Sequence, residues 1–310
     1  MRRRLLVTLS AVLARASAQD ARREQDAPRV ASGKKHHASA YDETAAHHAS
    51  TYDETAARRA LALAQASYCV APGDTAWACP TCVDRVDVHA IFDGGGGRAV
   101  VGYDRQEKTL FVAFRGSENV PNWINNLKFV KIHPWESLPD VGVDSGFFDW
   151  YLALRPGLLG NLTSAAARFK SSRVRLTGHS AGSAPAVFLA FELARGLFDD
   201  DVSLAVADVT TFGSPRLGDG HFVESYADAG LSETRVTHYR DCVPHLPLDD
   251  MFWLGYAHLP TEVYYDEAST VATVCDGSGE DASCSDNCTL CTSVADHLYY
   301  LNVSLGAFAC

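Results

Sequence analysis

The 310-residue sequence lacks an excess of positive charge: it has 27 lysine and arginine residues against 38 aspartates and glutamates, a net charge of −11. This balance argues against binding to nucleic acid or to anionic membrane surfaces, because both attract basic proteins. Beyond its N-terminus, the sequence also lacks any apolar run long enough to cross a bilayer as a helix. We therefore expect no nucleic-acid partner and no integral membrane span.

The first 18 residues have the pattern of a secretory signal peptide. Three arginines at residues 2–4 precede the apolar run LLVTLSAVLA, and residues 16–18 form an A-x-A cleavage site. Removal of residues 1–18 takes away four arginines and no acidic residue, so 23 basic and 38 acidic residues remain, a net charge of −15. We expect a soluble protein that is secreted to the extracellular space.

Residues 19–50 are polar, rich in alanine and poor in large apolar side chains, which is typical of a segment without a fixed fold. An eleven-residue duplication, HHASAYDETAA followed by HHASTYDETAA, begins inside this segment. Its histidines could bind metal, but a duplicated, solvated segment is the preferred interpretation, and we expect no metal site and no cofactor. The basic pairs at residues 22–23 and 34–35 favour a propeptide.

The folded region is expected over residues 51–310. Thr51 and Glu54 have the spacing of a capping box, which predicts a helix over residues 52–67. Strands and helices then alternate. The expected elements are TLFVAF at 109–114, a helix at 147–170, VRLT at 174–177, a helix at 180–196, DVTTFG and RVTHYR. Such alternation predicts one α/β domain with a mostly parallel central sheet and helices on both faces.

Residues 178–182, GHSAG, have the G-x-S-x-G pattern of a nucleophile elbow, between an apolar strand and an apolar helix. A serine hydroxyl is a weak nucleophile, so Ser180 would need a base to take its proton and an acid to orient that base. The usual chain order is serine, acid, histidine. Asp241, directly after RVTHYR, is the candidate acid. His245, His258 and His297 all follow it, and the residues alone do not choose among them.

Five motifs occur in a characteristic order: FRGS, GHSAG, TFGSPRLGD, RDCVPHLP and TSVADHLYYL. In order and spacing the chain from about Thr55 to Cys310 resembles the filamentous-fungal triacylglycerol lipases of lipase class 3, whose fold is that of the α/β-hydrolases. The resemblance implies that Asp241 is the triad acid and His297 the base. An oxyanion hole would take one donor from the backbone N–H of Ala181, and the resemblance implies that Ser117 supplies the other.

Nine cysteines in a secreted chain imply disulfides with one cysteine left over, here expected to be Cys242. The resemblance implies three bridges, and the C-x-x-C spacing of Cys288 and Cys291 is taken as a fourth. The four expected pairs are Cys69–Cys310, Cys79–Cys82, Cys275–Cys284 and Cys288–Cys291. Glycosylation sequons at Asn161, Asn287 and Asn302 fit the same secretory route.

The stretch SENVPNWINNLKF at residues 117–129 places Val120, Trp123, Ile124 and Leu127 at the spacing of one helix face. The same pattern is typical of ordinary core packing. The resemblance implies instead a short helical lid that covers the catalytic groove in water and turns its apolar face to a lipid surface.

We therefore expect a secreted serine hydrolase that cleaves the ester bonds of acylglycerols at a lipid–water interface, through a Ser180–Asp241–His297 triad, and that acts as a monomer. Feruloyl esterases, phospholipases and galactolipases share this fold and triad, and remain alternatives. The apolar segment after FRGS favours lipid, because the resembling segment of feruloyl esterases is a polar, open loop. A non-catalytic interaction protein is a remote alternative, since such proteins usually lose a triad residue or an elbow glycine.

Overall fold

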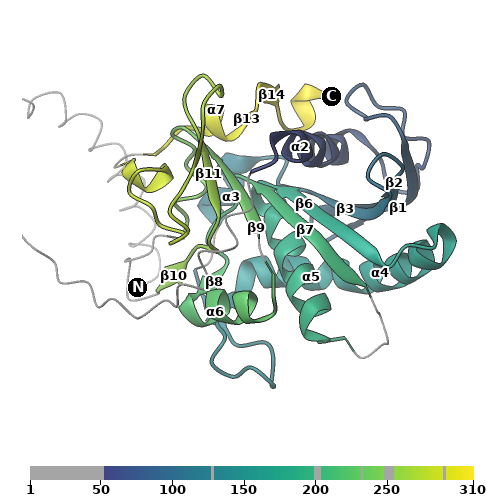
Figure 1. Ribbon diagram of the computed structural model, residues 1–310, viewed down its shortest axis with the longest axis horizontal. Helices are drawn as coiled ribbons and strands as arrows, with labels where there is room; N and C mark the ends of the chain where they lie inside the picture. The colour runs from purple at the N-terminus through teal and green to yellow at the C-terminus, as the bar shows by residue number, and fades with distance from the viewer. Residues whose placement is uncertain (1–51, 127–128, 199–203, 232, 248–254, 289–290) are drawn as a thin grey trace, which may run out of the picture. The chain divides into compact units, whose positions relative to one another are not determined.

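The computed structural model describes residues 52–126, 129–198, 204–231, 233–247, 255–288 and 291–310 (Figure 1). The chain divides into two units, Met1–Thr51 and Tyr52–Cys310, and all described residues belong to the second unit. The expected signal peptide, the segment 19–50 and Leu127 of the expected lid lie outside the described residues. No helix within the described residues is both long and apolar enough to cross a membrane.

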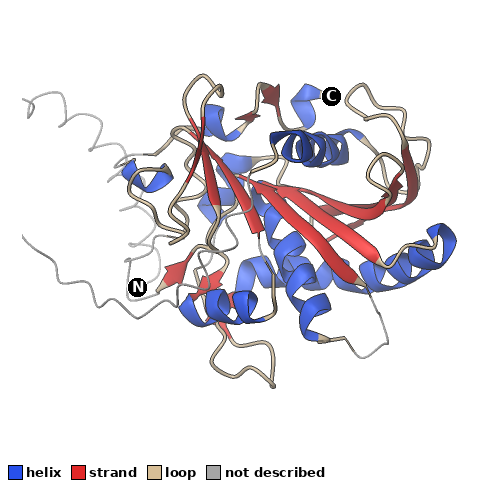
Figure 2. Cartoon of the chain, in the orientation of Figure 1, coloured by secondary structure: helices blue, strands red, loops and turns tan. Residues whose placement is uncertain are grey.

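A large sheet lies at the centre of this unit (Figure 2). It has eight strands in the order β1-β2-β3-β6-β7-β9-β11-β12. Its central strands β3, β6, β7, β9 and β11 pair in parallel, while β1 with β2, β2 with β3, and β11 with β12 pair antiparallel. The strands are β1 (Val86–Gly94), β2 (Gly97–Asp104), β3 (Thr109–Arg115), β6 (Arg173–His179), β7 (Ala205–Phe212), β9 (Glu233–His238), β11 (Glu262–Tyr265) and β12 (Ala272–Val274). The predicted mostly parallel sheet is thus confirmed.

Helices cover both faces of the sheet, as predicted. Helix α2 (Glu54–Cys69) lies on one face, and α4 (Ser145–Phe169) and α5 (Ser183–Arg195) lie on the other (Figure 1). Strand β3 shows why both faces must be covered: Leu110, Val112 and Phe114 pack into the cluster that includes α4 and α5. Its alternate residues Phe111 and Ala113 pack into the cluster that includes Leu63 of α2. A strand with apolar side chains on both faces is typical of a buried parallel sheet.

Smaller elements surround the main sheet. The remaining helices are α3 (Val120–Asn126), α6 (Gly220–Asp228) and the short α7 (Val294–His297). The remaining strands, two residues each, are β4 (Lys131–Ile132), β5 (Val143–Asp144), β8 (Gly218–Asp219), β10 (Tyr256–Ala257), β13 (Tyr299–Tyr300) and β14 (Val303–Ser304). They form a four-stranded sheet, β10-β8-β5-β4, and a two-stranded sheet, β13-β14.

The predicted first helix is present, but its predicted N-terminal cap is wrong. The helix begins at Glu54 and ends at Cys69, and the carboxylate of Asp53 accepts hydrogen bonds from the backbone N–H groups of Thr55 and Ala56. An aspartate that immediately precedes the first turn satisfies free N–H donors and also favours the positive end of the helix dipole. These two effects outweigh the capping-box spacing on which the prediction was based.

A buried carboxyl on β9 gives the fold a dependence on pH. Glu233 is 2% exposed and accepts a hydrogen bond from the Thr211 hydroxyl. Burial raises its pKa to about 7, above the 4.5 of an unperturbed glutamate. The folded protein therefore holds a proton that the unfolded chain releases, and stability is lost as the pH rises from about 4.5 to about 7.

The Glu233→Gln variant is therefore expected to be more stable than the wild type at pH 8, by about 2–3 kcal/mol. The amide oxygen can still accept the Thr211 hydroxyl bond, and no charge is left to bury. Urea unfolding at pH 5 and pH 8 measures the difference, which should shrink at pH 5. The matched control is Glu267→Gln at an exposed position, where we expect little change. Equal stability of the Glu233→Gln variant and the wild type at pH 8 would contradict this account.

Candidate catalytic site

Ser180 lies at the tight turn between β6 and α5. Strand β6 ends at His179, a 3-10 turn spans Ser180–Gly182, and α5 begins at the next residue. Ser180 itself has φ of +59°, the strained left-handed conformation expected of a nucleophile elbow. A Cβ atom at Gly178 would come within 2.1 Å of the Gly182 carbonyl oxygen, and one at Gly182 within 2.5 Å of the Phe114 carbonyl oxygen. Both glycines of the motif are therefore required by close backbone contacts.

His297 and Asp241 lie together in the core. The Nδ1 atom of His297 is 2.8 and 2.9 Å from the two carboxylate oxygens of Asp241, and the two side chains are 0% and 1% exposed. His297 is the last residue of α7, and Asp241 follows β9 and forms an isolated bridge with Ser293. Because a carboxylate accepts only, Nδ1 of His297 carries a proton and Nε2 of the neutral ring is left with its lone pair.

Tyr300 and a backbone N–H complete the surroundings of Asp241. The Tyr300 hydroxyl donates to Oδ2 of Asp241, and the Val243 N–H donates to Oδ1 at 2.8 Å. Burial alone would raise the pKa of Asp241, but His297, Tyr300 and Val243 together hold the pKa of this carboxyl below its ordinary value. The carboxylate therefore stays ionised in the folded protein and can orient a histidine. Tyr300 lies in the motif TSVADHLYYL, but no role was predicted for it.

The other two candidate histidines have different surroundings. Nε2 of His258 donates to the Pro244 carbonyl oxygen at 2.7 Å, and burial lowers the pKa of this ring well below its usual value. His245 is partly buried, and its pKa is also lowered by burial. Among the described residues, His297 is the histidine that hydrogen-bonds to Asp241.

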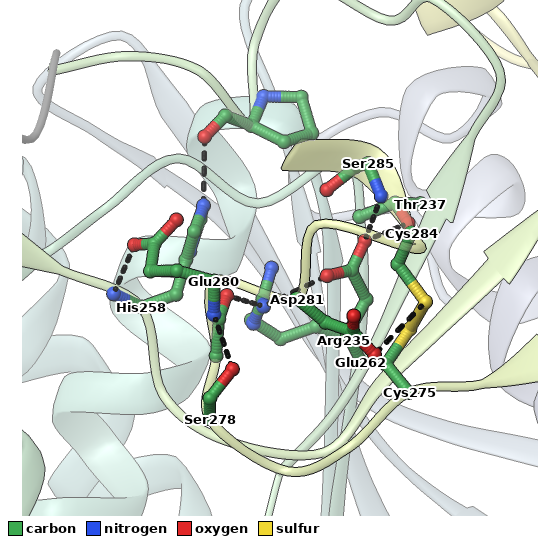
Figure 3. Close-up of polar contacts among 12 residues, drawn as sticks. Arg235, Thr237, His258, Glu262, Cys275, Ser278, Glu280, Asp281, Cys284 and Ser285 are labelled. Carbon is green, nitrogen blue, oxygen red and sulfur yellow. Dashed lines mark hydrogen bonds and ion pairs between the residues drawn. A yellow bond between two sulfur atoms is a disulfide. The ribbon is translucent and has the colours of Figure 1, made fainter. Parts of the chain in front are cut away.

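A polar cluster lies among β9, β11 and the loop that carries the Cys275–Cys284 disulfide (Figure 3). The backbone N–H of His258 donates to Glu280. Arg235 donates to the carbonyl oxygens of Leu259 and Gly279. Arg235 is also 3.5 Å from Glu262, whose carboxylate accepts from Thr237 and Ser285. These bonds join β9 and β11 to the loop closed by the Cys275–Cys284 disulfide. Through the bond from His258 to Pro244, this network supports the position of Asp241.

Ser180 and His297 are fully buried, and each has one atom available for chemistry. The hydroxyl oxygen of Ser180 and Nε2 of His297 have no hydrogen-bond partner among the described residues. The ring of His179, the residue before Ser180, stacks on the ring of His297 with centroids 4.6 Å apart, so the base packs against the segment that carries the serine. A hydroxyl and an oriented imidazole on adjoining segments can act as nucleophile and general base, and the hydrogen bond between such a pair is often formed or tightened only when substrate binds.

The loop after β3 contacts the turn that carries Ser180. A Cβ atom at Gly116 would lie 3.0 Å from Cβ of Ser180, so Ser117, the next residue, follows a point of contact with the elbow. Arg115 holds this loop by an ion pair with Glu118 and a hydrogen bond to the Gly96 carbonyl oxygen. Ala181 is fully buried in the middle of the 3-10 turn. The two expected oxyanion residues therefore belong to loops that meet at Ser180.

Helix α3 packs on the loops that hold the acid and the base. The Asn119 side chain accepts a hydrogen bond from the Asn122 N–H at the start of the helix. Val120 of this helix forms an apolar cluster with Cys242 and Val243, on which Trp123, Ile124, Val294 and Leu298 also pack. Trp123 additionally contacts the Phe147 ring, with centroids 5.7 Å apart. The helix thus covers residues that directly follow Asp241 and that flank His297.

The structure contains the disulfides Cys69–Cys310, Cys79–Cys82, Cys275–Cys284 and Cys288–Cys291, and Cys242 is a free, buried thiol. These are the pairs expected from the sequence. Burial, and then the charge of Asp241, raise the pKa of the Cys242 thiol to about 12, so it is not a nucleophile at neutral pH. The first bridge ties the end of α2 to the segment that follows His297.

A comparison with family models matches residues 111–251 to the class 3 lipases. The chain is 32% identical to a lipase of Rhizomucor miehei over 250 residues, which is 77% of this chain and 66%, slightly less than two thirds, of the relative. It is 30% identical to secreted mono- and diacylglycerol lipase A of Penicillium cyclopium, over 68% of this chain and 67% of the relative.

A comparison with solved structures gives the same group of proteins. One similar structure is a triacylglycerol lipase whose catalytic centre is a triad like that of the serine proteases. It superposes with a TM-score of 0.74 at 29% identity, over 84% of this chain and 98% of that one.

Proposed function

Since the chain belongs to the class 3 lipase family and has the α/β-hydrolase fold, we propose that it is a serine hydrolase that cleaves the ester bonds of acylglycerols. The observation that carries the proposal is the Asp241–His297 pair, which leaves Nε2 of the base without a hydrogen-bond partner among the described residues, as is the buried Ser180 hydroxyl. The relatives are named as lipases, and this chain has every residue type that the reaction requires.

The proposed reaction proceeds through an acyl-enzyme. Oγ of Ser180 attacks the acyl carbonyl while Nε2 of His297 takes its proton, and Asp241 stabilises the imidazolium. The backbone N–H of Ala181 and the N–H and hydroxyl of Ser117 stabilise the oxyanion. The intermediate collapses as the imidazolium gives its proton to the departing alkoxide. Water, activated by the same base, then attacks the acyl-enzyme and releases the fatty acid.

Helix α3 serves in this proposal as the lid. Its apolar residues Val120, Trp123 and Ile124 cover the loops of the acid and the base, so substrate could reach Ser180 only after the helix moves. The net charge of −15 that remains without residues 1–18 argues that the contact with lipid is apolar rather than electrostatic. The apolar character of α3 favours acylglycerols over feruloyl esters. Phospholipids and galactolipids remain alternatives for the substrate panel below.

Secretion and a monomeric state are part of the same proposal. The N-terminal sequence pattern, the four disulfides and the secreted relative support export to an oxidising compartment. Residues 1–18 would be removed as a signal peptide and residues 19–50 as a propeptide.

Two measurements test the proposed function. Labelling with a serine-reactive phosphonate should modify Ser180 alone, and a chain that is not labelled there is not this kind of hydrolase. A panel of triolein emulsion, phospholipid, galactolipid, methyl ferulate and a soluble short-chain ester then assigns the substrate. The proposal predicts the highest rate on triolein, and a highest rate on methyl ferulate would contradict it.

The Trp123→Ala variant separates a lid from ordinary packing. We expect about a tenfold or greater loss of activity on triolein emulsion, but less than a threefold loss on a soluble ester, because a shortened apolar face binds the interface less well. The matched control is Trp150→Ala on α4, where a half-buried tryptophan packs away from the acid and base loops. That control should leave the ratio of the two activities unchanged. An equal loss on both substrates in Trp123→Ala would make α3 a packing element only.

A further inference from the structure

His179, the residue that precedes the elbow serine, makes hydrogen bonds through both of its ring nitrogens. It is fully buried, with Nδ1 2.8 Å from the Tyr68 hydroxyl and Nε2 2.9 Å from the backbone carbonyl oxygen of His297. Its ring also stacks on the ring of His297, with an angle of 29° between the planes. The His179 side chain therefore contacts both the backbone and the side chain of the candidate base His297.

The hydrogen bonds from Gly116 through Tyr68 and His179 to His297 form a continuous series, and the direction of each bond is fixed. The His297 carbonyl oxygen only accepts, so Nε2 of His179 must donate. Burial, helped by the nearby His297, lowers the pKa of His179 to about 3, so the ring is neutral and Nδ1 has a lone pair. The Tyr68 hydroxyl therefore donates to Nδ1. Its oxygen accepts the Gly116 N–H at 3.1 Å.

This series of hydrogen bonds joins three separate parts of the site. Gly116 precedes the expected oxyanion residue Ser117, His179 precedes Ser180, and the chain ends on the backbone of His297 itself. We propose that His179, held in place by Tyr68, is a positioning residue that fixes the orientation of the His297 ring and couples the Ser117 loop to it. This inference rests on the proposed function, because it assigns His297 as the base.

The local geometry explains why the base needs such support. Helix α7 has a single turn, so its last carbonyl groups have no partners within a continuing helix. Two buried histidines donate to consecutive carbonyl oxygens there: Nδ1 of His238 to that of Asp296 at 3.0 Å, and Nε2 of His179 to that of His297. The His179 bond reaches the base residue itself. A general base must be held within about 0.5 Å and 10–20° of its working geometry.

The test compares three variants. His179→Phe keeps an aromatic ring but removes both hydrogen bonds, and we expect kcat on a soluble ester to fall about 30- to 100-fold, with KM changed less than about threefold. His179→Gln restores a donor toward the His297 carbonyl, so its kcat should be at least about fivefold higher than that of His179→Phe. Tyr68→Phe removes one hydroxyl with little change in packing, and kcat should fall about tenfold.

Titration with the serine-reactive phosphonate counts the molecules whose Ser180 is reactive. Dividing the rate by this number gives kcat per reactive site, so a misfolded fraction does not affect the comparison. His89→Phe, a half-buried histidine on β1, is the matched control and should keep its kcat. The inference is overturned when His179→Phe or Tyr68→Phe has the wild-type kcat per reactive site, or when only the number of reactive sites falls. If His179→Phe does not fold, Tyr68→Phe decides the question. Failure of the phosphonate to label wild-type Ser180 is a different result, which rejects the proposed function.

Discussion

The Ser180→Ala variant is expected to lose about 10⁵- to 10⁶-fold in kcat on a soluble ester, because the nucleophile is removed and only substrate binding and the oxyanion donors remain. The fold should be unaffected. The Ser180 hydroxyl makes no hydrogen bond to a described residue, and alanine meets no more steric conflict than serine at this backbone conformation. Melting temperature and circular dichroism should therefore match those of the wild type.

Ser225→Ala provides the control for that measurement. Ser225 is a buried serine on α6 whose hydroxyl binds Arg195, and its backbone carbonyl keeps a second bond to the same guanidinium after substitution. We expect kcat to stay within about twofold of the wild type. Substantial esterase activity in purified Ser180→Ala protein would show that Ser180 is not the nucleophile.

The Asp241→Asn variant is expected to lower kcat by about 10³- to 10⁴-fold. The Val243 N–H requires an oxygen at the Oδ1 position, so the new amide group would lie at the Oδ2 position, beside His297 and Tyr300. The amide would donate to Nδ1 of His297 and thereby select the tautomer with its proton on Nε2. That tautomer cannot accept the proton of Ser180.

Tyr300→Phe is the informative comparison for that variant. It keeps the carboxylate and the tautomer of His297 and removes one donor to Asp241, so we expect a loss of only about tenfold or less in kcat. Rates of phosphonate labelling should follow the same order. If Asp241→Asn retained more than about one tenth of the wild-type kcat, an orienting role for this carboxylate would be excluded.

The sequence was sufficient to locate the nucleophile, because the elbow depends on local features. Gly178 and Gly182 are required by contacts within a few residues of Ser180 and with the neighbouring strand, and the strand, turn and helix occur consecutively. The alternation of apolar segments likewise predicted β3, β6 and α5, whose apolar runs directly reflect burial.

The base could not be selected from the residues alone, since His245, His258 and His297 all follow Asp241. The selection depends on packing: α7 bridges back to Asp241 through Ser293, a contact between residues 52 positions apart. Only the family resemblance pointed to His297 in advance. Tyr68 and Tyr300 were missed for the same reason, because their partners are distant in sequence and no local pattern marks them.

The antiparallel edge of the sheet was also not predicted, although a signal was present. VDVHAIFDGGGGRAVVGYD contains two β segments joined by consecutive glycines, and Gly95 and Gly96 have φ of +59° and +89° in the resulting hairpin. The four-stranded sheet of two-residue strands had no such signal. Strands of that length are too short to show a periodicity, and they form only where other elements bring them together.

The bridge between Cys69 and Cys310 affects the unfolded chain more than any local contact does. It joins residues separated by 241 positions and so removes a large share of the conformations that the unfolded chain would otherwise explore. In the chain-entropy description, a loop of this size stabilises the native state by about 5 kcal/mol, which is comparable with the whole folding free energy of many domains. Thioredoxin-like reductants that open this one bridge would therefore shift the folding equilibrium by several thousandfold.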